Sequence, residues 1–166
     1  MMRWFVHIGV WLLAVGGTCA YGNRPYVEVA RFRGDASGAV SLTFDDAFPS
    51  QIEKAIPILD AKGLHATFFV HTENVKETWA STWGAWRAAA ASGHEVGSHT
   101  KTHPNLTHVR SARQLRSEIA GSADIIEQQL GTRPISFAYP FSGVNDAVRR
   151  QVLEVYLLDR SNCRIW

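Results

Sequence analysis

The sequence is poor in cysteine and in clustered charge. Only two of its 166 residues are cysteines, Cys19 and Cys163. If Cys19 leaves with the N-terminal segment described below, Cys163 has no partner, which excludes a fold held by intramolecular disulfides. The chain has no run of lysine and arginine and a formal net charge of only +2, which argues against a nucleic-acid partner and against a membrane-surface partner. It also lacks short repeats and low-complexity tracts, and 46% of its residues are hydrophobic, as in a globular domain.

The N-terminus has the pattern of a secretory signal peptide. Arg3 precedes an almost wholly apolar run at 4–15, and small residues at 16–20 would suit cleavage after Ala20. The apolar run is too short to span a membrane comfortably. We therefore expect an exported protein, periplasmic or secreted, with no membrane association beyond export. The expected organisation is a signal peptide at 1–20, a lead-in segment at 21–38 and one domain at 39–166.

Within this domain, strand-like and helical patterns alternate. The expected strands lie at 39–44, 66–70, 95–98, 135–139 and 155–158, and the expected helices at 49–62, 79–92, 111–130 and 145–153. This order predicts an α/β fold with a parallel sheet and helices packed outside it. In such folds the chemistry gathers at the carboxyl ends of the strands.

Two groups of candidate ligands follow expected strands. Asp45 and Asp46 end the first strand, where adjacent carboxylates need a compensating cation, although an aspartate pair can also begin a helix. His99 and His103, four residues apart, follow the third strand, and Pro104 favours a turn between them over a helix. A lone pair of histidines could equally be structural. Together, however, Asp46, His99 and His103 make a set of two histidines and one carboxylate that leaves coordination positions open, as in a catalytic metal site. Zinc suits the set best, and cobalt, nickel or iron could also fit.

Four segments, in this order, resemble the polysaccharide deacetylases, carbohydrate esterase family 4, with the NodB homology domain. The resemblance covers about residues 36–160, and its segments are 43–46 (Thr-Phe-Asp-Asp), 66–70 (Ala-Thr-Phe-Phe-Val), 99–104 (His-Thr-Lys-Thr-His-Pro) and 137–141 (Phe-Ala-Tyr-Pro-Phe). It implies a deformed (β/α) barrel of seven strands.

The resemblance also implies a reaction and a role for each site residue. A divalent metal held by Asp46, His99 and His103 would polarise an acetyl carbonyl, and Asp45 would act as general base on water. The backbone N–H of Phe141 would help to hold the oxyanion, and Tyr139 and Pro140 would shape the groove. The expected substrate is an N-acetylated polysaccharide or oligosaccharide, with O-acetyl esters as an alternative.

Three departures from the family pattern affect these expectations. Ala47 stands where the family usually has glycine, and Ala138 stands where an arginine often contacts the catalytic base. The family's later motifs include a histidine general acid, whereas no histidine follows His108. We therefore expect a C-terminally truncated or divergent copy, or a fragment of a longer chain, with an incomplete barrel. Two alternatives remain open: a catalytically inactive protein that binds metal and polysaccharide, and a metal amidohydrolase acting on small amides.

Histidines and charges outside these motifs are expected to be structural or surface residues, which applies to His65, His71, His94 and His108. Trp79, Trp83 and Trp86 recur at helical spacing and predict a stripe that faces the core. The charges of Arg110, Arg113, Arg116 and Glu118 are expected to form a solvated helix face.

Overall fold

The computed structural model describes residues 36–75 and 81–161. The expected signal peptide at 1–20, most of the expected lead-in, Trp79 and Cys163 lie outside the described residues. Residues 1–39 and 40–166 form two separate units, and the fold presented below is that of the second unit.

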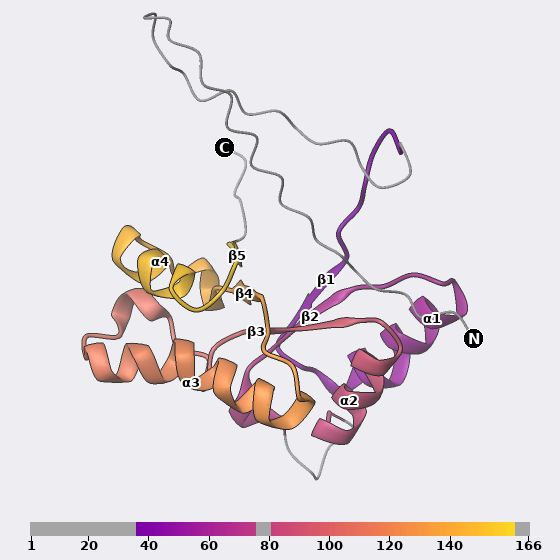
Figure 1. The fold of residues 1–166 in the computed structure, drawn as a ribbon, viewed down its shortest axis with the longest axis horizontal. Helices are drawn as coiled ribbons and strands as arrows, with labels where there is room; N and C mark the ends of the chain where they lie inside the picture. Colours follow the sequence, from indigo (N-terminus) through magenta and orange to yellow (C-terminus); the bar gives the residue numbers. More distant parts are fainter. Residues whose placement is uncertain (1–35, 76–80, 162–166) are drawn as a thin grey trace, which may run out of the picture. The chain divides into compact units, whose positions relative to one another are not determined.

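Five short parallel strands form one sheet (Figure 1). They are β1 (Thr43–Asp45), β2 (Thr67–Val70), β3 (Glu95–Ser98), β4 (Ser136–Ala138) and β5 (Leu158–Arg160). Their spatial order is β1-β2-β3-β4-β5, so each strand lies beside its neighbour in the sequence.

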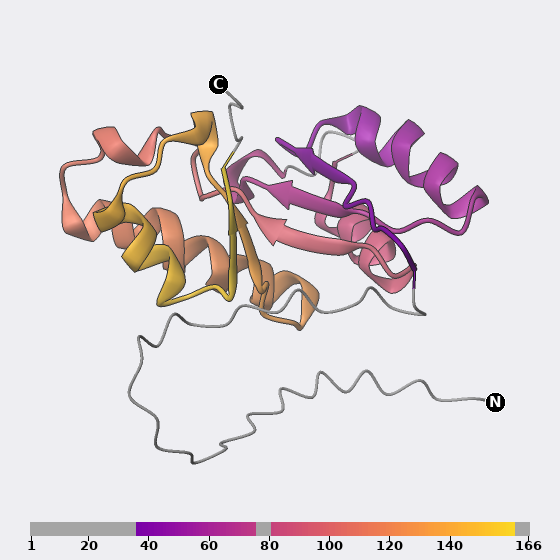
Figure 2. The same cartoon turned by 90° about the horizontal axis from the view of Figure 1, so that it is seen from above.

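The strand order places the helices on one face. Right-handed crossovers between successive neighbouring strands all pass over the same side of a sheet, which favours a barrel over an open sheet with two covered faces. The connecting helices are α1 (Ile56–Ala61), α2 (Trp83–Ala91), α3 (Ala112–Leu130) and α4 (Asp146–Leu153). Figure 2 shows these helices flanking a curled sheet. The expected α/β architecture is confirmed, as an incomplete barrel of five strands.

Two apolar clusters hold the helices to the sheet. In the first cluster, Phe68 of β2 is fully buried, stacks on Phe44 at a centroid distance of 4.9 Å and packs against Trp86 of α2. The second cluster joins β4 to α3 and α4 through Phe137, Ile119 and other buried side chains. The expected core-facing position of Trp86 is confirmed, since its side chain is fully buried. Trp83 is partly buried against the same cluster.

Two expected strands are displaced in the structure. The first begins at Thr43 rather than at 39, and Val40 is 86% exposed. The fifth occupies Leu158–Arg160 instead of 155–158. Tyr156 explains the second error, because it is buried against α3 and its hydroxyl donates to the carbonyl of Ile119 at 2.8 Å. Of the apolar residues that suggested a strand, Tyr156 and in part Val155 therefore serve the core after the end of α4, whereas Leu157 and Leu158 are exposed.

The expected helix at 49–62 has an irregular interior. Gln51–Ala55 is π-helical and runs directly into α1, where the N–H of Ile56 donates to the carbonyl of Gln51. Pro57 has no N–H to complete an α-helical bond to residue 53, and its ring would crowd that carbonyl. A local shift to i→i+5 bonding relieves this conflict.

Gly97 of β3 lies where the sheet interior has no room for a side chain. A Cβ built on Gly97 would lie 2.5 Å from Ser136 Oγ and 2.7 Å from ring carbons of Phe69. We expect Gly97→Ala to lower the free energy of unfolding by about 1–3 kcal/mol, because neighbouring side chains must shift. Gly121→Ala is the control, since its nearest neighbour would be 3.7 Å away within α3. This control should raise stability by about 0.5–1 kcal/mol. Urea unfolding of both variants measures the difference, and equal effects would contradict the packing argument.

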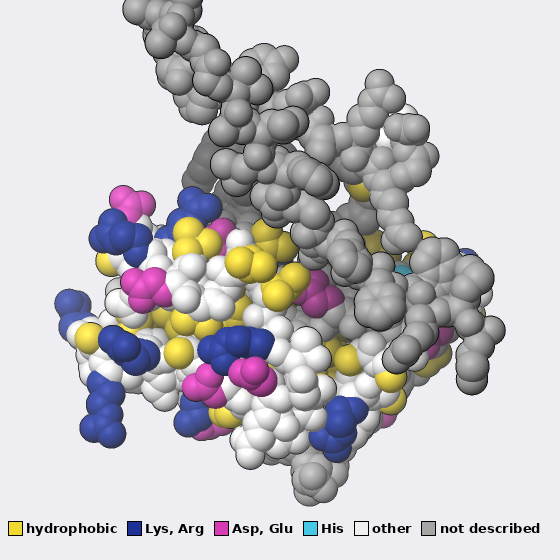
Figure 3. All heavy atoms as spheres, in the orientation of Figure 1, with side chains coloured by type: hydrophobic (Ala, Val, Ile, Leu, Met, Phe, Trp, Pro, Cys, Tyr) yellow, Lys and Arg dark blue, Asp and Glu magenta, His cyan; other side chains and the backbone are white. Residues whose placement is uncertain are grey.

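The charged side chains are mixed in sign on the visible surface. Figure 3 shows basic and acidic groups interspersed over the face that it presents. Arg133 is an example, because it pairs with Asp124 at 3.0 Å and with Glu127 at 2.6 Å. Among the described residues, no helix has the length and apolar character needed to cross a membrane.

Candidate metal centre and active site

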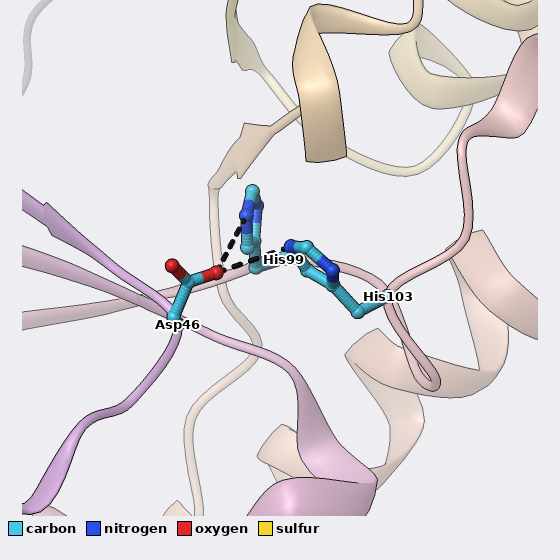
Figure 4. Close-up of side chains that lie close together, drawn as sticks. All are labelled: Asp46, His99 and His103. Carbon is cyan, nitrogen blue, oxygen red and sulfur yellow. Dashed lines mark ion pairs between the residues drawn. The ribbon is translucent and has the colours of Figure 1, made fainter.

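Three candidate ligands converge at the carboxyl edge of the sheet. Asp46 directly follows β1, and the segment bearing both histidines directly follows β3. Asp46 Oδ1 lies 3.5 Å from His99 Nε2 and 3.1 Å from His103 Nε2, as Figure 4 shows. The three donor atoms all lie within 4.8 Å of one another. The structure therefore brings together the residues that the sequence nominated as a metal set.

The geometry of these donors fits a small divalent metal. Ligands bound tetrahedrally at about 2.0–2.2 Å lie about 3.3–3.6 Å apart, close to the two distances measured from Asp46. His99 Nδ1 lies 2.8 Å from the carbonyl oxygen of Ala138. Donation of Nδ1–H to this carbonyl leaves the Nε2 lone pair directed at Asp46 and free to bind a metal.

Burial keeps the central histidine in its metal-binding form. His99 is only 3% exposed, and burial is the main cause that lowers its pKa below the ordinary value. The hydrogen bond to Ala138 and the nearby carboxylates oppose this shift. The neutral imidazole, which can bind a metal, is therefore favoured near neutral pH.

His71 lies beside this site, although it is not one of the three converging donors. Its ring centroid lies 5.1 Å from that of His103. Burial, followed by the charges of His103 and His99, lowers the pKa of His71 to about 4, so its ring is neutral near neutral pH. His71 directly follows β2, the strand between β1 and β3. Side chains that follow neighbouring parallel strands meet at one edge of a sheet, so the rule that identified the candidate ligands also predicts this position for His71.

Unusual backbone conformations gather in, or directly after, three of the segments that carry the family resemblance: 43–46, 99–104 and 137–141. Among the described residues, non-glycine residues with positive φ are Asp46, Ala47, Thr100, His103, Phe141 and Ser142. Left-handed geometry is costly for alanine and is a genuine outlier for β-branched threonine. Ala47 has a φ of 56°, which explains why the family usually places glycine there. Strain concentrated in this way is a feature of functional sites.

Asp45 is held by an arginine from β5. Arg160 Nη2 hydrogen-bonds and pairs with Asp45 Oδ1, and the guanidinium carbon lies 5.1 Å from the ring centroid of Phe69. Arg160 is the register partner of Ala138, the position where the family often has its arginine. The guanidinium of Arg160 on β5 therefore reaches Asp45, the carboxylate that an arginine at position 138 often contacts in the family.

The segment at 137–141, called the third motif below, lies beside the metal set and has both buried and exposed parts. Tyr139 is 5% exposed, and its hydroxyl donates to Asp159 at 2.8 Å. Pro140 is fully buried. Phe141 is 70% exposed, and its ring centroid lies 4.8 Å from that of His103. This places an accessible aromatic ring next to the metal set, with Tyr139 and Pro140 beneath the surface.

Glu118 was expected on a solvated helix face, and this expectation is wrong. Arg110, Arg113 and Arg116 are exposed as expected, whereas Glu118 is only 4% exposed. Glu118 lies three residues after Leu115 and four before Ser122, and both of these are buried in α3. The helical spacing therefore indicated that Glu118 is buried, but its charge favoured an exposed position instead.

Comparisons with known proteins agree with this fold. A family model described as "Polysaccharide deacetylase" matches residues 33–156. The peptidoglycan-N-acetylmuramic acid deacetylase PdaC of Bacillus subtilis (strain 168) is 34% identical over 125 residues, which cover 72% of this chain and 25% of PdaC. Gellan lyase of a Bacillus species is 37% identical over 120 residues, covering 72% of this chain and 5% of that protein.

A solved structure gives the same result in three dimensions. The Streptococcus pyogenes deacetylase PplD, in complex with acetate, aligns with a TM-score of 0.68 and 28% identity, covering 72% of this chain and 54% of PplD. The fold and the site thus define an incomplete α/β barrel in which two histidines and one carboxylate converge at one edge of the sheet. The chain belongs to the polysaccharide deacetylase family. It spans a quarter or less of the curated relatives named above.

Proposed function

We propose that this chain is a metal-dependent hydrolase that removes acetyl groups from an N-acetylated polysaccharide or oligosaccharide. The observation that carries the proposal is the convergence of Asp46, His99 and His103 beside Asp45 at one edge of the sheet. Peptidoglycan-N-acetylmuramic acid deacetylase and chitin deacetylase are among the names of its relatives. Such polymers lie outside the cytoplasm, in agreement with the signal peptide expected at 1–20.

Asp46, His99 and His103 would hold the metal, most suitably zinc, with cobalt, nickel or iron as alternatives. When bound there, the metal would polarise the acetyl carbonyl and lower the pKa of a bound water. The neutral state of His99 and the orientation of its ring by Ala138 both favour binding. Because the set supplies three protein ligands, positions remain for water and for the substrate oxygen.

Asp45 would take a proton from the attacking water as general base. Arg160 holds one of its carboxylate oxygens, which fixes the direction in which the carboxylate faces. The products would be acetate and a free amine, or an alcohol if the substrate is an O-acetyl ester. The leaving group also needs a proton, which Asp45, once protonated, would return.

Residues of the third motif would complete the site. The backbone N–H of Phe141 would help to hold the oxyanion, and the left-handed conformation at Phe141 sets its direction. The exposed Phe141 ring offers a surface against which a sugar can pack. Tyr139, anchored through Asp159, and the buried Pro140 would shape the groove from beneath.

Acetate release from N-acetylglucosamine oligomers tests the proposal. The protein with its N-terminal segment removed, residues 21–166, is assayed with added zinc and with a chelator, alongside an acetylated xylan to compare ester cleavage. We expect release with zinc and its loss with chelator. Zinc binding and oligosaccharide binding without release would overturn hydrolysis in favour of a binding protein. Release only from small amides would instead identify a metal amidohydrolase.

A further inference from the structure

Helix α3 presents a buried carboxylate to the segment that carries both histidines. Glu118 is 4% exposed, and burial of a charged group is unfavourable unless hydrogen bonds compensate it. Its Oε2 accepts the backbone N–H groups of Lys101 at 3.0 Å and Thr102 at 2.8 Å. Its Oε1 accepts the hydroxyl of Thr102 at 2.7 Å. All three donors come from the turn between His99 and His103.

This turn adopts a conformation that its residue types do not favour. Thr100 has a φ of 70° and His103 a φ of 64°. A β-branched residue in the left-handed region persists only when its surroundings impose it. The turn also folds back on itself, because His103 N–H donates to Thr100 Oγ1 at 3.0 Å. Contacts from outside the turn must therefore impose this backbone conformation.

Ser122, one helical turn after Glu118, holds the start of the same turn. The Ser122 hydroxyl donates to the carbonyl of Thr100 at 3.1 Å and lies 2.7 Å from Ser98 Oγ. Ser98 Oγ in turn accepts the N–H of Thr100 at 3.3 Å. These groups form a closed cycle in which each hydroxyl both donates and accepts, an arrangement that strengthens its members. One face of α3 therefore fixes both the beginning and the middle of the turn.

We propose that Glu118 is a positioning residue for the metal centre, acting through the turn rather than by contact with metal or substrate. Its three hydrogen bonds hold 100–102 in the strained conformation that directs His99 and His103 to one point. This inference rests on the proposed metal site. Outer partners that orient metal ligands typically change metal affinity or activity by about 10–100-fold when they are removed.

Three variants separate positioning from general stability. Glu118→Ala removes the three hydrogen bonds that the Glu118 carboxylate accepts from the turn. We expect zinc affinity to fall by about 10–100-fold. Glu118→Gln is the conservative variant, because its carbonyl can accept both N–H groups while its amide donates to the Thr102 hydroxyl. It should keep zinc affinity near that of the unchanged protein. Ile126→Ala is the matched control, since Ile126 is fully buried on the same helix and packs in the apolar core. It should lower thermal stability and leave zinc affinity unchanged.

Zinc affinity is measured by competition with a chromophoric chelator, at a temperature where circular dichroism shows each variant folded. Unfolding with a chelator present reports stability without metal, and the visible spectrum of the cobalt-loaded protein reports ligand geometry. The expected result is a weakened and altered cobalt spectrum for Glu118→Ala alone. If Glu118→Ala loses stability as Ile126→Ala does but binds zinc like the unchanged protein, the positioning role is wrong while the metal site stands. If the unchanged protein binds no zinc, both are wrong.

Discussion

Replacement of Asp45 by asparagine is expected to abolish most acetate release while zinc remains bound. Asparagine keeps the shape of the side chain but cannot take a proton from water, and a positioned general base contributes about 10²–10⁴-fold to rate. Asp45 is not part of the convergent set formed by Asp46, His99 and His103. The activity should therefore fall by about that factor, with zinc affinity close to that of the unchanged protein. Initial rates with saturating zinc, together with chelator competition, measure the two quantities separately.

Variants of the adjacent residues provide the contrast. Asp46→Ala and His99→Ala each remove one of the three proposed metal ligands, so both should lower zinc affinity sharply and lose activity for that reason. Excess zinc should restore part of their activity but none of the activity of Asp45→Asn. If all three variants kept zinc equally, Asp46 and His99 would be excluded from the metal site. If Asp45→Asn lost zinc as well, the proposed division between the two neighbouring carboxylates would be wrong.

The positions of the ligands were predictable because they depend on topology more than on detail. Alternating strand and helix patterns indicated parallel strands, and parallel neighbours end at one edge. The ends of β1 and β3 were therefore sufficient to bring Asp46 near His99 and His103. A displacement of the start of β1 did not affect this result, because its end was placed within one residue.

The residues that support the ligands could not be identified in the same way. Arg160 ends β5. The expected strand was placed at 155–158 because those residues are apolar, so Arg160 lay outside it. Glu118 is charged, and only the hydrogen bonds of a folded turn make its burial favourable. The positive φ of Thr100 is imposed by tertiary contacts, so its residue type argued against the observed conformation.

Replacement of Arg160 by methionine is expected to reduce turnover strongly without releasing the metal. Arg160 pairs with Asp45 and stacks near Phe69, while Ala138 beside it contributes no cation. Methionine preserves much of the apolar stem but leaves the Asp45 carboxylate free to rotate away from the attacking water. We expect kcat to fall by about 10–100-fold, the range for partners that orient a functional group. The KM and the zinc affinity should change little, because the guanidinium pairs with Asp45, which lies outside the set formed by Asp46, His99 and His103.

A charge-retaining variant and a remote arginine act as controls. Arg160→Lys keeps a positive charge but loses the planar fork that fixes a carboxylate, so its activity should lie between those of the methionine variant and the unchanged protein. Arg133→Met removes an arginine that pairs with Asp124 and Glu127 on α3. This change should leave turnover unaffected. An equal loss of activity in both methionine variants would indicate a general effect of lost charge.

Combining Arg160→Met with Asp45→Asn tests whether the arginine acts through the carboxylate. Residues that work as a unit have strongly non-additive effects, so Arg160→Met should cost little in a protein that already carries Asp45→Asn. We expect the double variant to match Asp45→Asn in kcat. If the two losses instead multiplied, Arg160 would act on the substrate independently of Asp45. The idea that Arg160 of β5 takes the role of the arginine that the family often has at position 138 would then be wrong. The outcome therefore decides whether Ala138 marks a lost function or one carried by the neighbouring strand.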